Sequence, residues 1–143
     1  MVNGWLTTAS CPSDWEFLRS ATVQGGRRSK RFALAGRPGT DRANPPVVVS
    51  VGEDRTVRLW QPTLGRLVKF ARLDTVPTAV AWSKDGTRIF TTGKDGRVRV
   101  LDPDSMEVSE TLTGIDGVAY AVAVAPDGHV FVGGQGGQLK CVK

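Results

Sequence analysis

The chain has 143 residues, enough for one ordinary domain with a sizeable core. Its apolar fraction of 40% and charged fraction of 23% are typical of globular proteins, and no apolar run approaches the ~20 residues of a membrane span. The N-terminus lacks a basic segment followed by an apolar core, so we expect no secretory signal and no membrane partner. Cys11 and Cys141 form neither a disulfide framework nor a metal-ligand set, which favours a reducing, cytoplasmic compartment.

The net charge of +5 is concentrated in the first third of the chain, because residues 1–46 alone carry +4. The basic segment 27–42 holds most of it, in Arg27, Arg28, Lys30, Arg31, Arg37 and Arg42. Such a cluster suits phosphate or an acidic partner. The aromatic and glycine patterns of nucleic-acid-binding modules are missing, so we expect a solvated loop and no nucleic acid partner.

Short apolar runs separated by glycine- and proline-containing turns predict strands along most of the chain. Residues 1–30 form an N-terminal segment with one candidate strand at 16–23. The first repeated unit has predicted strands at 31–35, 47–51, 57–60 and 66–71, with a long loop at 36–46. The second has them at 78–82, 88–92, 98–101 and 107–112, and a third unit covers residues 118–143. The fold class is therefore all-β.

The units repeat with a fixed period. Gly52, Gly93 and Gly134 follow one another at intervals of 41 residues, and each precedes a similar strand. A second matched pair of segments, 79–86 and 121–128, is offset by 42, so we infer one inserted residue. The Asp-Gly pairs at 85–86 and 127–128 favour tight hairpins, because both central positions tolerate positive φ. A period near forty is typical of stacked supersecondary units.

The segments Ser50–Trp60 and Thr91–Leu101, each a Gly-x-Asp turn followed by an apolar strand, resemble repeats of the WD-repeat β-propeller family. The resemblance implies a partial propeller of two to three four-stranded blades, at about 31–72, 76–113 and 118–143. It departs from the family pattern where Leu101 and Val142 replace the tryptophan and Gly136 replaces the turn aspartate. It also implies a non-catalytic protein-interaction scaffold. The alternative is a regulatory or substrate-docking segment of a larger enzyme.

Two to three blades are fewer than the four that closed propellers generally need. An open stack exposes apolar faces and a sheet edge, which are costly because each buried Val or Leu is worth ~1.5–3 kcal/mol. We considered three remedies. The chain is a fragment or subunit of a larger propeller, it self-associates to complete a ring of six blades, or residues 16–23 add the missing strand to the last blade.

The aspartates at turn positions, Asp54, Asp85, Asp95 and Asp127, are expected to cap their turns rather than to form a site. His129 directly follows one of these turns and is expected to be solvated. No nucleophile motif, metal-ligand spacing or phosphate-binding loop accompanies them. We therefore expect no catalytic residue, no metal site and no cofactor.

Other side chains are assigned structural roles. Trp60 is expected to anchor the core or a blade junction, and Trp82 to pack near the end of an inner strand, with partner contact as an alternative. Cys141 is expected to be a small apolar filler. A basic row occupies equivalent positions of the three units, Arg58, Arg99 and Lys140. We expect these side chains to pair with acids of adjacent blades, and binding of a polyanion is the alternative. Partner contacts are expected in the loops, at 36–46, 72–77 and 114–117.

Overall fold

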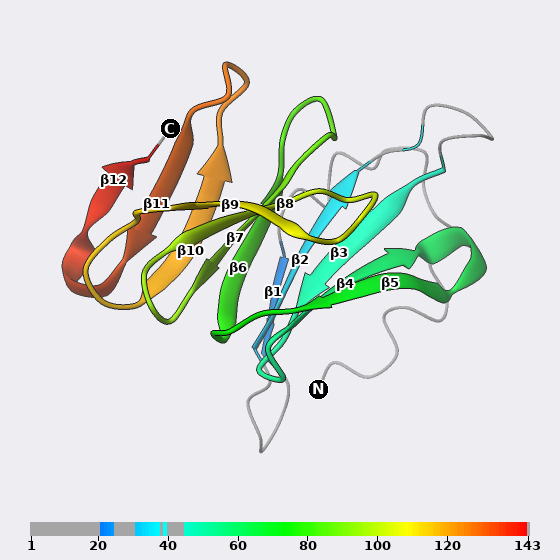
Figure 1. Ribbon diagram of the computed structural model, residues 1–143, viewed down its shortest axis with the longest axis horizontal. Helices are drawn as coiled ribbons and strands as arrows, with labels where there is room; N and C mark the ends of the chain where they lie inside the picture. Colours follow the sequence, from blue (N-terminus) through cyan, green and yellow to red (C-terminus); the bar gives the residue numbers. More distant parts are fainter. Residues whose placement is uncertain (1–20, 25–30, 38, 40–44, 143) are drawn as a thin grey trace.

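Three antiparallel sheets make up the described part of the chain, residues 21–24, 31–37, 39 and 45–142 of a computed structural model (Figure 1). The first sheet has five strands, β1 (Ala21–Gln24), β2 (Arg31–Arg37), β3 (Val47–Val51), β4 (Thr56–Gln61) and β5 (Arg66–Arg72). The second has β6 (Pro77–Trp82), β7 (Ile89–Gly93), β8 (Val98–Leu101) and β9 (Val108–Leu112). The third has β10 (Ala119–Val124), β11 (Val130–Gly134) and β12 (Leu139–Cys141). The predicted all-β class is confirmed, and the helical segments described are two short 3₁₀ turns, Pro62–Leu64 and Gln135–Gly137.

The sheets are arranged as neighbouring blades of a partial propeller. The inner strand β6 lies beside β2 of the first sheet and beside β10 of the third (Figure 1). From β2, β6 and β10 onward, successive strands of each sheet pair in chain order away from that centre, and β1 pairs with the other edge of β2. Side-chain hydrogen bonds join the inner strands on both sides of β6. The Trp82 indole donates to the carbonyl oxygen of Ala35, and the Thr78 hydroxyl donates to that of Ala119. The strands β2, β6 and β10 therefore lie side by side, and the later strands of the three sheets fan outward.

Apolar side chains fill the two junctions between sheets. The first junction buries branched residues of the first and second sheets, among them Val49, Val57, Leu59, Val80, Ile89 and Leu101. The second junction buries the corresponding residues one sheet further on, among them Phe90, Val98, Val100, Val130 and Val132. Because side chains alternate along a strand, the middle sheet contributes one face to each junction. It is the only sheet of the described chain that is covered on both faces.

A residue with left-handed backbone recurs in the turns of the three sheets, and two of the three such residues are glycines. Arg55, Gly96 and Gly137, spaced 41 residues apart, have φ values of 64°, 75° and 72°. At the β6–β7 turn, however, only Gly86 has a positive φ, of 71°, and Asp85 does not. The predicted tight hairpin at Asp85-Gly86 is therefore wrong. The chain instead forms a longer turn, closed by hydrogen bonds from Gly86 to Ser83 and from Ser83 to Arg88.

The 42-residue offset has a local cause. The Ser83 amide bonds the Arg88 carbonyl in the β6–β7 turn, and the Ala125 amide bonds the His129 carbonyl in the β10–β11 turn. The β10–β11 turn is one residue shorter than the β6–β7 turn, so the offset returns to 41 residues at the equivalent positions Arg88 and His129. The connection before β10 is one residue longer than the connection before β6. Leu73 and Ile115 are therefore equivalent residues at an offset of 42. Each of these two donates its amide to the left-handed residue of the preceding turn.

The N-terminal part of the chain enters the first sheet. β1 pairs antiparallel with β2, with Ala21 opposite Leu34 and Gln24 opposite Arg31. Residues 16–20 of the predicted strand at 16–23 lie outside the described residues. Its last residues, from Ala21 on, belong to β1, so the structure places them in the first sheet and not beside the third. The third sheet has three described strands.

Candidate functional site

The β6–β7 turn is fixed by the carboxylate of Asp85. It accepts hydrogen bonds from the Thr87 amide at 3.1 Å, the Thr87 hydroxyl at 2.8 Å and the Ser83 hydroxyl at 2.5 Å. These bonds lower the pKa of Asp85 to about 2, and the bond from Ser83 has the largest effect. Asp85 is therefore ionised at neutral pH and occupied by its own turn, as expected.

Asp127 holds the equivalent β10–β11 turn. Its carboxylate accepts the His129 amide at 3.1 Å and approaches the imidazole Nδ1 of His129 at 2.8 Å. The backbone bond from His129, followed by the side-chain bond, lowers the pKa of Asp127. The imidazole is exposed, as expected, but it is also paired with this carboxylate. The pair stabilises the β10–β11 turn, which is the structural role expected of Asp127.

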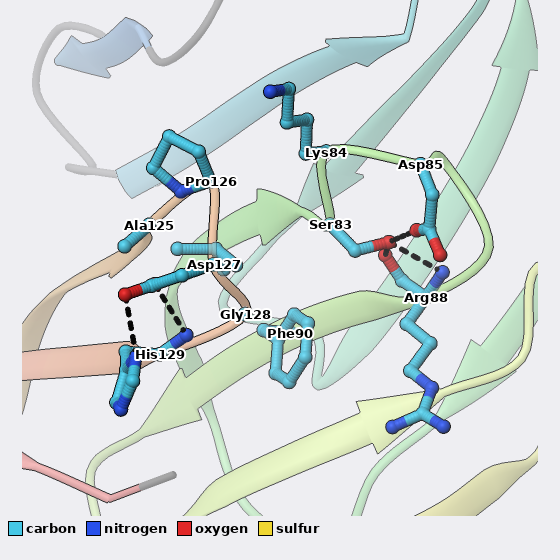
Figure 2. Close-up of a pocket in the computed structure, with 11 residues that line it drawn as sticks. Ser83, Lys84, Asp85, Arg88, Phe90, Ala125, Pro126, Asp127, Gly128 and His129 are labelled. Atoms are coloured by element: carbon cyan, nitrogen blue, oxygen red, sulfur yellow. Dashed lines mark hydrogen bonds and ion pairs between the residues drawn. The ribbon is translucent and has the colours of Figure 1, made fainter.

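A groove of about 740 Å³ lies between these two turns, at one end of the junction between the second and third sheets (Figure 2). Its floor is apolar, since it is formed by the buried ring of Phe90 together with Val124, and the figure shows Phe90 between the two turns. Exposed polar side chains line its two walls, Lys84, Asp85 and Arg88 from the second sheet and Asp127 and His129 from the third. Sequence reasoning missed this groove, because it exists only where two equivalent turns of adjacent sheets meet.

The basic row lies on β4, β8 and β12, close to the turns at the other end of the sheets. Arg99 is only 4% exposed and bridges two acids, with Nη2 at 2.7 Å from both Asp95 and Asp74. The hydrogen bond to Asp95 is the main cause that raises the pKa of Arg99. Burial alone raises the pKa of Asp95, but the bonds from Arg99 and from the Arg97 amide outweigh it and lower that pKa. Asp74 lies in the connection between the first and second sheets and Asp95 in the turn next to Arg99, so Arg99 pairs with acids but with none inside an adjacent blade.

The other members of the row differ. Arg58 pairs at 2.6 Å with Asp54 of its own turn and not with an adjacent blade, so that expectation is wrong for Arg58. Asp54 also accepts the amide and hydroxyl of Thr56, as expected of a turn-capping residue. Lys140 is exposed on β12. The row therefore presents no continuous surface of unpaired cations for a polyanion.

Trp82 packs near the end of the inner strand β6, as expected, whereas the role expected of Trp60 is wrong. The half-buried indole of Trp60 donates a 2.8 Å hydrogen bond to the Ser50 hydroxyl within its own sheet, so Trp60 does not anchor a junction. Trp82 does, because its indole bonds the first sheet and its ring lies 5.5 Å from the guanidinium carbon of Arg37. Cys141 is exposed, so its predicted role as an apolar filler is also wrong. The described part of the third sheet has no neighbour over that face.

Comparison with known proteins agrees with this architecture. Residues 71–102, from the end of β5 to just beyond β8, match the family described as WD domain, G-beta repeat. Residues 71–102 therefore form a WD repeat, and the chain as a whole is similar to WD-repeat proteins. It is 32% identical over 120 residues to nuclear distribution protein PAC1 of Coccidioides posadasii, covering 80% of this chain and 25% of that protein. It is 36% identical over 86 residues to coronin-7 of Rattus norvegicus, covering 59% of this chain and 9% of the relative.

The chain thus spans a quarter or less of the length of these relatives. Proteins of the WD-repeat family are generally non-catalytic scaffolds that bind other proteins. Within the part of the chain that the structure describes, no three His, Cys, Asp or Glu side chains gather as metal ligands. Nor does a described helix have the length and apolarity to cross a membrane.

Proposed function

We propose that the chain is a non-catalytic protein-interaction scaffold that receives a partner segment in the groove between the β6–β7 and β10–β11 turns. The observation that carries the proposal is the groove itself, an apolar floor between two turns that their own aspartates hold rigid. Preorganised turns lose little conformational entropy when a partner binds. A rigid repeat scaffold gains its binding specificity from contacts made by the turns at the rims of its blades.

The chemistry of the groove indicates the kind of segment it accepts. The Phe90 ring and Val124 offer an apolar surface for one inserted aliphatic or aromatic side chain. Lys84 and Arg88 stand exposed on one wall, while the neighbouring Asp85 is engaged by its own turn. A carboxylate beside the inserted side chain would pair with these two cations. An extended segment with an apolar residue flanked by an acidic one fits best.

The organisation of the chain follows the same proposal. Residues 31–143 would carry the blades, at about 31–72, 76–113 and 118–143, and residues 1–30 would form an N-terminal segment that contributes to the first sheet. We place the protein in the cytoplasm, which is supported by the sparse cysteines of the sequence. The groove would serve as its principal partner site, ahead of the loops at 36–46, 72–77 and 114–117.

Site-specific photo-crosslinking in cell extract tests the groove. A photoreactive residue in place of Lys84 should capture discrete partners. One in place of Lys94, which is exposed in the β7–β8 turn at the opposite end of β7, should not. Arg88→Glu should abolish the adducts formed at position 84, because it reverses the charge of one groove wall. The matched variant Arg97→Glu, in the β7–β8 turn, should leave them unchanged. Equal capture at both positions, or adducts insensitive to Arg88→Glu, would contradict the proposal.

A further inference from the structure

Each sheet has one face, here called the leading face, that points toward the next sheet along the chain. Its central residues recur at intervals of 41, as Val49, Val57 and Leu59 in the first sheet, Phe90, Val98 and Val100 in the second, and Phe131, Leu139 and Cys141 in the third. In the first two sheets these residues are buried in the junctions. In the third sheet Phe131 is 38% exposed and Leu139 is 76% exposed. The third leading face is therefore an apolar surface without a cover among the described residues.

The opposite face, here called the trailing face, points toward the preceding sheet. Its central pairs also recur at intervals of 41, as Val48 and Trp60 in the first sheet, Ile89 and Leu101 in the second, and Val130 and Val142 in the third. The later two pairs cover the leading faces before them. In the first sheet Val48 and Trp60 remain half-buried, and Phe70 of β5, on the same face opposite Arg58, is 61% exposed.

The exposed apolar residues concentrate on the two end sheets. Of the large hydrophobic side chains that the structure describes as exposed, Val108 alone belongs to the middle sheet. The others lie in the first and third sheets or in the turn that follows β4, as Leu64, Leu67, Val68, Phe70, Tyr120, Phe131 and Leu139. Water-exposed apolar patches of this kind mark interaction surfaces. The chain thus exposes one leading face and one trailing face, the two halves of a junction it builds twice internally.

We propose that the third sheet's leading face packs on the first sheet's trailing face of a second copy of the chain, and that two such junctions close a ring of two copies. The contact is heterologous, since different surfaces meet, and a heterologous contact closes only where the rotation allows it. Two stacks of three sheets make six, within the four to eight blades of known propellers. The new junctions continue the internal ones with the same residue positions. This inference does not depend on the groove.

Light scattering coupled to gel filtration, on the full chain, measures the association. We expect a mass of about 31 kDa, twice the chain mass of 15.3 kDa. Leu139→Lys on the leading face and Phe70→Lys on the trailing face should each raise the dissociation constant at least tenfold. Both side chains are exposed, so the fold should survive, which circular dichroism would verify. Val108→Lys, on the outer strand of the middle sheet, is the matched control and should leave the mass at two copies.

Mixing the two variants provides the sharper test. Neither variant alone can form an intact junction, but the Phe70→Lys copy keeps its leading face and the Leu139→Lys copy keeps its trailing face. The mixture should therefore form a one-to-one complex through a single intact junction. A monomeric wild type, an equal effect of Val108→Lys, or a mixture that stays monomeric would overturn the proposal. The crosslinks at position 84 are read separately, so failure here leaves the groove proposal standing.

Discussion

The Trp82 indole nitrogen, on the last residue of β6, donates a 3.0 Å hydrogen bond to the carbonyl oxygen of Ala35 in the neighbouring sheet. The same ring packs against the apolar core of the first junction and lies under the guanidinium of Arg37. One side chain thus supplies apolar contact, a cation–π contact and a directional bond between two sheets that are 47 residues apart in sequence at this point. The orientation of the first two blades depends on it.

Trp82→Phe should destabilise the chain by about 2 kcal/mol, because it leaves a part-buried carbonyl without its donor and reduces the packed area. Trp60→Phe makes the same chemical change and should cost about 1 kcal/mol or less, since its partner is a hydroxyl that can turn to water. Urea denaturation followed by circular dichroism measures both. Equal losses for the two variants would show that Trp82 does not hold the junction.

Arg99→Met should cost about 3 kcal/mol, because it leaves the part-buried carboxylate of Asp95 without its counter-charge. Arg58→Met removes the equivalent side chain of the first sheet. Its ion pair with Asp54 is exposed to water, so the loss should stay below about 1 kcal/mol. Thermal unfolding of the two variants compares them directly. The ranking would be refuted if Arg58→Met proved the more destabilising.

Gly96→Ala should be strongly destabilising. A Cβ at this position would lie 2.1 Å from the carbonyl oxygen of Ile115 and 2.5 Å from that of Gly117, and the φ of 75° already disfavours a side chain. We expect a loss of about 3 kcal/mol, from strain plus displaced backbone. Gly65→Ala has a similar φ of 61° but open space around the Cβ, so it should lose only about 1 kcal/mol. Comparable midpoints in urea for the two variants would argue against this packing.

The turn of Asp85 should make stability depend on acid. The pKa of Asp85 is lowered to about 2 in the folded chain, below its usual value of 3.8. Its contribution is therefore fully present above about pH 4 and is lost as pH falls toward 2. The melting-temperature difference between the wild type and Asp85→Asn should shrink over this interval and stay constant from pH 5 to 8. A melting-temperature difference that does not change with pH below 4 would show that the ionised Asp85 carboxylate does not stabilise the turn.

The repeat made most of the fold predictable. The interval of 41 residues identified the strands β3–β9 to within one or two residues, because turn glycines and alternating apolar residues are local signals. Turn geometry was harder. The shorter β10–β11 turn and the left-handed Arg55 depend on hydrogen bonds and backbone angles that residue type does not specify.

Contacts between sheets were the part that sequence did not reveal. The acceptor for Trp82 is a backbone carbonyl, which any residue supplies, and the second acid at Arg99 comes from a connection between blades. Cys141 occupies the position of the buried Leu59 and Val100, yet burial there requires a following sheet. The groove over Phe90 likewise needs two neighbouring turns. Each of these features depends on how neighbouring sheets stack, and the sequence of a single unit contains little information about that stacking.

The stacking of the sheets is tested most directly by nuclear Overhauser contacts of the Trp82 indole proton. The structure predicts cross-peaks from this proton to the α-protons of Ala35 and Gly36 and slow exchange of the proton with solvent, because it is bonded across the first junction. Cross-peaks confined to residues of β6 and β7, with rapid exchange, would mean that the first two sheets do not pack as neighbouring blades.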